Sequence, residues 1–240
     1  DVAEYKFNGL TSTFKGLKDG DYILVEDTAP AGYSVVSEFK FTIKGGKVEN
    51  VESATNGRSY KDEKGNIVVE DAPIVKLSKE SLGGTPIPES AGKAEFTLIA
   101  NDEGATLQGV KINGNEVTED TNETKFSGNA VDFEYLKAGK YTLVEDTAPT
   151  GYSVVSSFTF TVDEKGKVTE VSSATNGRSY KDEKGSIVVE DTPIIKIDKK
   201  EVGGTPIPEE SGKAKFKLTA EDADKTLEGV KVNGGEALGE

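Results

Sequence analysis

Two residue types that often carry chemistry are missing, since the chain contains no cysteine and no histidine. Zinc sites, disulfides and Ser-His or Cys-His nucleophiles are therefore excluded. Lysine amines and carboxylates remain, including the neighbouring acids Glu26 and Asp27 and, later in the chain, Glu145 and Asp146. Adjacent residues of a strand point to opposite faces, so neither couple forms a glycosidase-type pair. We expect no enzyme acting on external substrates, and no cofactor.

Two oxygen-rich segments could hold calcium, NDEG at 101–104 and EDTN at 119–122. Neither segment has the ligand spacing of a calcium-binding loop. Solvated turns are the favoured interpretation, and we predict no metal site.

The charge balance restricts the partners. The formal net charge is −14, which argues against nucleic acid and against an anionic membrane surface. No apolar run is long enough to span a membrane, and no signal peptide opens the chain. The sequence starts at Asp1 without a methionine, so we interpret it as a piece of a longer protein.

An internal repeat determines the organisation. The segment SATNGRSYKDEKG occupies 53–65 and returns unchanged at 173–185. LVEDTAP begins at Leu24 and again at Leu143, and GGTPIPE begins at Gly83 and again at Gly203. The repeating unit is therefore about 120 residues long, an ordinary domain size.

The repeat predicts three domains: the C-terminal portion of one unit at 1–71, a complete unit at 76–191, and the N-terminal portion of another at 196–240. The last portion is the half that 1–71 lacks. Two explanations remain open: a uniform array is cut at an arbitrary point, or the front half of one chain completes the back half of another. In the second case, uncovered strand edges and apolar faces would favour head-to-tail fibres.

The elements that must position any reactive groups are strands. Segments 39–43 and 158–162 alternate apolar and polar residues with period two, and 22–26, 67–69 and 96–99 are rich in β-branched and aromatic residues. Turn signals separate these runs. The pattern predicts an all-β fold of tandem antiparallel β-sandwiches with little helix. Proline-containing links at 72–75 and 192–195 should join the units tightly and stack them into a rod.

Two strings make the prediction more specific. GDYILVEDTAPAGY (20–33) and GKYTLVEDTAPTGY (139–152) resemble the E-box strand of Cna B-type domains, which are prealbumin-like sandwiches of Gram-positive adhesins and pilins. Residues 74–79 resemble the strand that carries the reactive lysine of that family, and 187–191 the strand of its amide-forming partner. The resemblance covers essentially the whole chain in family order.

The resemblance implies a self-formed Lys–Asp isopeptide bond assisted by a buried glutamate. Many members use asparagine in the last strand. The aspartate here is similar to that of the streptococcal domain used in split tag-and-catcher pairs, and it would release water instead of ammonia. In the complete unit the implied residues are Lys76, Asp191 and Glu145. In the split unit they are Lys196, with Asp71 and Glu26.

A plain ion network is the alternative to a covalent bond. Strand alternation places Glu145 and Asp191 on inward faces, whereas Glu70 and Glu190 should point outward. Lys76 is ambiguous, because the apolar residues on both sides of it make the opposite face the buried one. A charge in a sandwich core is costly without a partner, so these groups need a reason to be there.

These observations predict a stalk or spacer repeat of an extracellular, wall-attached adhesin or pilus-like fibre, with neighbouring copies of the repeat as partners. A module that binds a host protein or glycan is the alternative, and a self-polymerising unit is a third. The near-identity of the repeats favours the spacer, since binding modules tend to carry variable, aromatic-rich loops.

Overall fold

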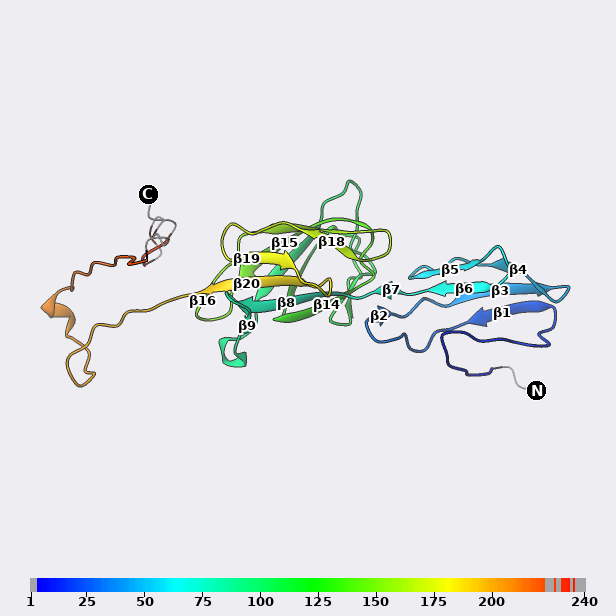
Figure 1. Cartoon of the computed structure of the whole chain (residues 1–240), viewed down its shortest axis with the longest axis horizontal. Coiled ribbons are helices and arrows are strands. Elements are labelled where there is room, and N and C mark those ends of the chain that lie inside the picture. The colour runs from blue at the N-terminus through cyan, green and yellow to red at the C-terminus, as the bar shows by residue number, and fades with distance from the viewer. Residues whose placement is uncertain (1–3, 223–226, 228–229, 234, 236–240) are drawn as a thin grey trace. The chain divides into compact units, whose positions relative to one another are not determined.

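The computed structural model describes residues 4–222, 227, 230–233 and 235. The chain divides into two units, one ending at Ile194 and the other beginning at Ile195, and each is described by itself. Figure 1 shows that strands dominate the first unit. In the described residues, helical structure is limited to two 3-10 turns, η1 (Glu89–Ala91) and η2 (Glu209–Ser211). The predicted all-β, prealbumin-like sandwich is confirmed.

Residues 75–193 form the complete sandwich from two sheets. One sheet has the order β13-β10-β15-β17-β18; its strands are Glu123–Ser127, Glu95–Ala100, Gly139–Thr147, Phe158–Val162 and Val168–Val171. The other has the order β12-β11-β14-β8-β20-β16; its strands are Asn115–Glu116, Lys111–Ile112, Ala130–Glu134, Val75–Ser81, Ile187–Pro193 and Tyr152–Ser153. Two further strands extend this sheet, β9 (Thr85–Pro86) beside β8 and β19 (Arg178–Lys181) beside β20.

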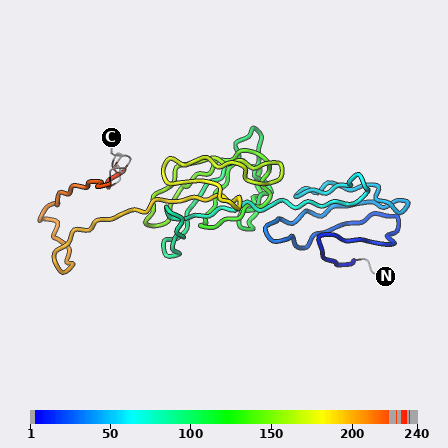
Figure 2. The backbone as a smooth tube through the Cα atoms, in the orientation of Figure 1, coloured from blue at the N-terminus to red at the C-terminus, as the bar shows by residue number. Residues whose placement is uncertain are grey.

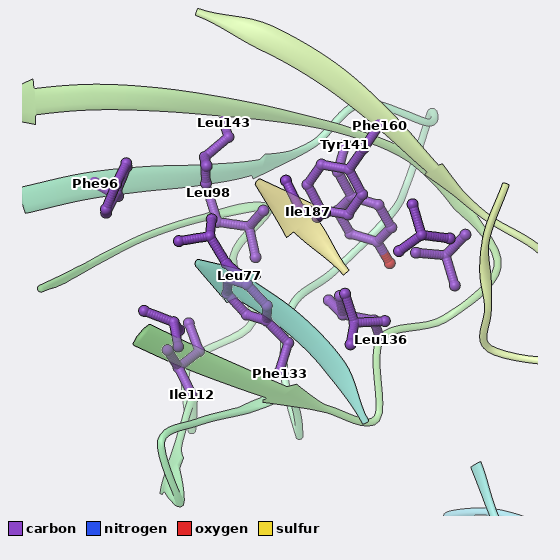
Figure 3. Close-up of a cluster of buried hydrophobic side chains, with 14 of the residues drawn as sticks. Leu77, Phe96, Leu98, Ile112, Phe133, Leu136, Tyr141, Leu143, Phe160 and Ile187 are labelled. Atoms are coloured by element: carbon purple, nitrogen blue, oxygen red, sulfur yellow. The ribbon is translucent and has the colours of Figure 1, made fainter. Parts of the chain in front are cut away.

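The core lies between the two sheets. Leu77, Phe133 and Ile187 enter it from the sheet of β8 and β20, and Leu98 and Leu143 enter it from the facing sheet (Figure 3). Each of these side chains comes from an alternating position of its strand, so the period-two pattern of the sequence becomes a continuous apolar layer. Tyr141 and Phe160 stack within that layer, with ring centroids 5.2 Å apart.

Truncation of the core should be costly. Leu98 is fully buried, and Leu98→Ala is expected to lower the free energy of unfolding by about 2–5 kcal/mol through lost burial and the cavity left behind. Leu82 is 44% exposed, so Leu82→Ala serves as the matched control and should cost much less. Urea unfolding of both variants checks the prediction; equal losses would contradict the assigned core.

One strand pair departs from the antiparallel prediction. β8 and β20, the first and last strands of the complete unit, run parallel and side by side, with Lys79 opposite Val189 and Ser81 opposite Asp191 (Figures 1 and 2). A parallel pair needs a long connection between its strands, and here the connection is the rest of the domain. This pairing brings the two ends of the repeat together.

Residues 4–71 reproduce the back half of that sandwich. They hold β1 (Gly20–Leu24), β3 (Phe39–Lys44) and β4 (Lys47–Val51) in one sheet, and β5 (Arg58–Lys61) paired with β6 (Ile67–Glu70). Val36, Phe39, Phe41 and Ile43 form a small buried cluster. Val69 of β6 is 37% exposed, whereas its equivalent in the complete unit, Val189, is fully buried.

The link after residue 71 is shorter than the sequence predicted. Ala72–Pro73 forms β7, which pairs with β2 (Tyr33–Ser34), and β8 already begins at Val75. Proline is tolerated in so short a pairing because its missing N–H can point away from the partner strand. The predicted link at 192–195 is likewise reduced, since β20 continues to Pro193.

The second unit has no strand among its described residues; these contain η2 and an isolated bridge between Lys200 and Pro206. Phe216 and Leu218 are 66% and 64% exposed, although their equivalents Phe96 and Leu98 are fully buried in the complete repeat. Equivalent positions are therefore core positions in the complete repeat and exposed positions in the second unit. Within the described part of the chain, no helix is long and apolar enough to cross a membrane.

Candidate cross-linking site

A buried lysine lies on the first strand of the complete repeat. Along β8 the inward positions are Val75, Leu77, Lys79 and Ser81, so Lys79 belongs to the core-facing row. Its side chain is fully buried. A lysine is almost never buried in this way without a partner, so the groups around its amine decide what it does.

Two carboxylates meet the Lys79 amine. Asp191 Oδ1, from the parallel neighbour β20, contacts Lys79 Nζ directly. Glu145 reaches across from β15 of the opposite sheet, and its Oε1 lies 2.8 Å from the same nitrogen. Both carboxylates are buried, and the ring of Phe96 lies 5.7 Å from the amine. Three ionisable groups thus converge inside an apolar core.

The backbone fixes the position of Glu145. The Val155 N–H donates a 2.7 Å hydrogen bond to Glu145 Oε2, which leaves Oε1 for the lysine. Burial raises the pKa of Glu145 to about 7, although the nearby Lys79 and the Val155 N–H act in the opposite direction. Glu145 can therefore hold and release a proton near neutral pH.

Asp191 is equally unusual. Its pKa is raised by burial, against the opposing influence of Lys79 and of a hydrogen bond with Glu145. Among the described residues, Asp191 Oδ2 and Glu145 Oε1 are buried oxygens that accept no hydrogen bond, although Glu145 Oε1 has its ion-pair contact with Lys79. A proton held by Glu145 and donated to Asp191 would satisfy both oxygens at once.

This arrangement can join a lysine to an aspartate. An amine attacks a carboxyl carbon when the amine is neutral and the carboxyl is protonated, and burial favours both neutral forms in general. Fixed strands hold the reacting groups in contact, which supplies a large effective concentration. A neighbouring acid can protonate the leaving oxygen. Lys79 and Asp191 are buried and in contact, and Glu145 is the neighbouring acid.

The structure corrects the predicted lysine. Lys76 lies on the outward face of β8, more than half of its side chain is exposed, and its amine is 3.6 Å from Asp132 Oδ1. Three positions separate Lys76 from Lys79, and an odd number of steps along a strand changes the face. Of the residues predicted for the complete unit, Glu145 and Asp191 lie together, whereas Lys76 does not join them.

The alternation of residues along β8 indicates which lysine is buried. Val75 and Leu77 define the inward row of β8, and the next lysine in that row is Lys79. The resemblance indicated the strand and gave no register within it. Alternation applied to the lysine, as it was to the carboxylates, would have selected the buried residue.

The back half at 4–71 preserves two of the three groups. Glu26 Oε2 accepts a 2.7 Å hydrogen bond from the Val36 N–H, as Glu145 does from Val155. The pKa of Asp71 is raised, first by burial and then by the charge of Glu26. The predicted lysine Lys196 is exposed and stands at the repeat position of Lys76, so the same correction selects Lys199 in its place.

Polar groups of the oxygen-rich loops form hydrogen bonds with nearby backbone. Asp102 accepts a hydrogen bond from the backbone N–H of Lys140 at 3.0 Å, and Thr121 bonds the backbone of Glu123. In the described residues, no group of three or more acidic side chains is arranged to hold a metal ion.

Comparison with known proteins gives one family. The family model described as "SpaA: Prealbumin-like fold domain" matches residues 6–58 and 75–178, which is more than half of the chain. A search of curated proteins found no match.

Solved structures give weaker likenesses. The C-terminal fragment of the pilus adhesin SpaC from Lactobacillus rhamnosus GG is 16% identical, with a TM-score of 0.33 over 76% of this chain and 80% of that one. The major pilin T3.2 from Streptococcus pyogenes is 15% identical, with a TM-score of 0.29 over 75% and 69%. The pilus adhesin RrgA from Streptococcus pneumoniae is 14% identical, with a TM-score of 0.34 over 67% and 23%. Likenesses at this level add nothing to the family match.

Proposed function

The chain belongs to the family of SpaA prealbumin-like fold domains, and from this premise we propose that it is a structural repeat of a Gram-positive pilus or surface adhesin. The proteins it resembles in structure are described as pilins and pilus adhesins. The observation that carries the proposal is the buried cluster of Lys79, Asp191 and Glu145 between the first and last strands. An extracellular stalk or spacer is the role that such a cluster serves best.

In the proposed reaction, Lys79 Nζ attacks the carboxyl carbon of Asp191. The new C–N bond forms as a carboxyl C–O bond breaks, and the oxygen leaves as water. Glu145 takes a proton from the nitrogen and gives one to the departing oxygen, so that it returns to its starting state. The net change is amine plus carboxylic acid to amide plus water. The step happens once per domain, so the chain has no turnover on external substrates.

The bond would strengthen the repeat as a load-bearing element. Lys79 and Asp191 are 112 positions apart in the sequence and adjacent in space, so the amide closes nearly the whole domain. By analogy with a disulfide closing a loop of ~100 residues, the stabilisation is about 4–5 kcal/mol. Tension on the chain enters at β8 and leaves at β20, and an amide between these strands prevents them from separating.

Neighbouring copies of the repeat are the proposed partners. A front half such as 196–240 and a back half such as 1–71 are the two parts of one sandwich, and pairing them head to tail would cover the exposed Phe216, Leu218 and Val69. In such a pair Lys199 would meet Asp71 and Glu26. The proposal holds for a front half supplied by any copy of the repeat.

Intact mass under denaturing conditions tests the proposed cross-link. The purified chain should be lighter than its sequence mass by one water, and a digest should contain a branched peptide that joins Lys79 to Asp191. Pairing through Lys199 would add covalent multimers on a denaturing gel, with a further water lost at each junction. A chain of unmodified mass would leave the sandwich without its cross-link and refute the proposal.

A further inference from the structure

Two duplicated segments have no part in the proposed bond: GGTPIPE, beginning at Gly83, and SATNGRSYKDEKG, at 173–185. In the complete repeat, both reach the outward face of β20, opposite the Lys79 cluster. They meet there at Glu190, the residue immediately before Asp191.

Glu190 is buried although it points away from the core; its side chain is only 3% exposed. The Arg178 guanidinium lies 3.1 Å from one carboxylate oxygen, and the Tyr180 hydroxyl donates to the other at 3.2 Å. The Gly83 N–H donates a third hydrogen bond, at 3.3 Å. Glu80 lies opposite Glu190 on β8, so the cation of Arg178 also offsets a like-charge pair.

The turn that follows β8 also bonds the backbone of Asp191, the residue after Glu190. The Leu82 N–H donates a 2.7 Å hydrogen bond to the Asp191 carbonyl, while its neighbour Gly83 bonds the Glu190 carboxylate. Gly83 has a φ of +96°, a conformation that side chains disfavour. We call Leu82, Gly83, Arg178, Tyr180 and Glu190 the strand clamp.

A glycine ties this clamp to the other carboxylate. A Cβ at Gly177 would lie 2.6 Å from the Glu190 carbonyl oxygen and 2.6 Å from Val155 Cγ2. Val155 is the residue whose N–H holds Glu145. Glycine is therefore required at position 177, where the chain packs against both the Glu190 carbonyl and Val155.

The back half at 4–71 shows what the turn contributes. Arg58 and Tyr60 contact Glu70 at 3.1 Å and 2.9 Å, as their equivalents contact Glu190. The Glu70 side chain is nevertheless 41% exposed, and among the described residues β6 has neither a lysine strand like β8 beside it nor the turn that follows that strand. The arginine and tyrosine thus hold the glutamate, and the turn after the lysine strand closes over it.

We propose that the strand clamp is a positioning device for the cross-link: it fixes the register of β20 against β8, so that the side chain after Glu190 faces Lys79. Glu190, Arg178 and Gly83 act through Asp191 and do not touch the reacting atoms. This inference rests on the proposed Lys79–Asp191 bond. It also gives the two duplicated segments a function in the repeat.

The rate of water loss tests the clamp. The full chain is made by cell-free synthesis, samples are quenched in denaturant at intervals, and the intact mass of each sample is measured. Glu190→Ala should form the bond roughly tenfold or more slowly, because a misplacement of about 1 Å can cost ~10²-fold in rate. Glu190→Gln should restore most of the rate, since its amide oxygen still accepts hydrogen bonds from Gly83 and Arg178.

Val188→Ala is the matched control. Val188 is buried on the same outward face of β20 and is no part of the clamp. Its truncation should lower the thermal midpoint, measured by circular dichroism in a Lys79→Ala background, and leave the rate unchanged.

Three results would overturn the clamp: a wild-type rate in Glu190→Ala, equal slowing in Val188→Ala, or a Glu190→Gln variant as slow as the alanine variant. An unmodified mass in the parent chain would instead refute the cross-link itself.

Discussion

Lys79→Ala is expected to abolish the loss of water in the complete repeat and to remove the branched peptide that contains Asp191. The variant also leaves Asp191 and Glu145 buried without the cation they face. Loss of the amide alone should cost about 4–5 kcal/mol, which for a domain of this size lowers the melting temperature by roughly 15–30 °C. Intact mass and a thermal melt measure the two effects.

Lys76→Ala is the matched control for this prediction. It removes a lysine from the same strand, three positions away, and breaks only an exposed 3.6 Å ion pair with Asp132. Exposed pairs contribute about 0–1 kcal/mol, so the variant should cross-link fully and melt close to the parent. If Lys76→Ala abolished the bond and Lys79→Ala did not, the assignment of Lys79 as the cross-linking lysine would be wrong.

Asp191→Asn separates the chemistry from the packing. The asparagine keeps a carbonyl carbon within reach of Lys79, and amide formation would then release ammonia instead of water. The unreacted variant is lighter than the unreacted parent by the mass difference between asparagine and aspartate. After loss of ammonia, however, its branched peptide should have the same mass as the branched peptide of the parent. This result would identify position 191 as the acceptor.

Strand alternation predicted the strands of the fold, and it agreed with the two carboxylates that the family resemblance implied. Glu145 and Asp191 each lie two positions from a core residue of the same strand, and the structure places both in the core beside Leu143 and Val189. The lysine was missed because the resemblance identified its strand without a register. The inward row of Val75 and Leu77 would have corrected it to Lys79.

Other features depend on contacts between distant segments. The parallel pairing of β8 with β20 joins residues more than 100 positions apart, and alternation within a strand carries no information about the direction of its neighbour. Glu190 was predicted to point outward, which is correct for its face. Its burial comes from a turn that belongs to the other end of the repeat, and no local pattern near Glu190 indicates that turn.

Glu145→Gln is expected to slow bond formation by about 10²–10⁴-fold, the usual contribution of a general acid and base. The glutamine oxygen can still accept the Val155 hydrogen bond, so the fold should persist while proton transfer is lost. Glu26→Gln is the control: Glu26 makes the equivalent bond to Val36 and lies outside the Lys79 cluster. It should leave the Lys79–Asp191 rate unchanged in the mass time course.

The pH dependence of the same reaction gives an independent test of Glu145. Burial raises its pKa to about 7, and the protonated form is the one that can donate to the leaving oxygen. As the pH rises above about 7, this form is lost, so the rate of the parent should fall relative to the rate of Glu145→Gln at the same pH, because the variant keeps the other ionisable groups of the site. In that variant nothing at position 145 titrates. If the parent and Glu145→Gln had parallel pH profiles from pH 7 to pH 9, Glu145 would have no part in the proton transfer, even if its replacement slowed the reaction. Glu145 would then act by shaping the site around Lys79 alone.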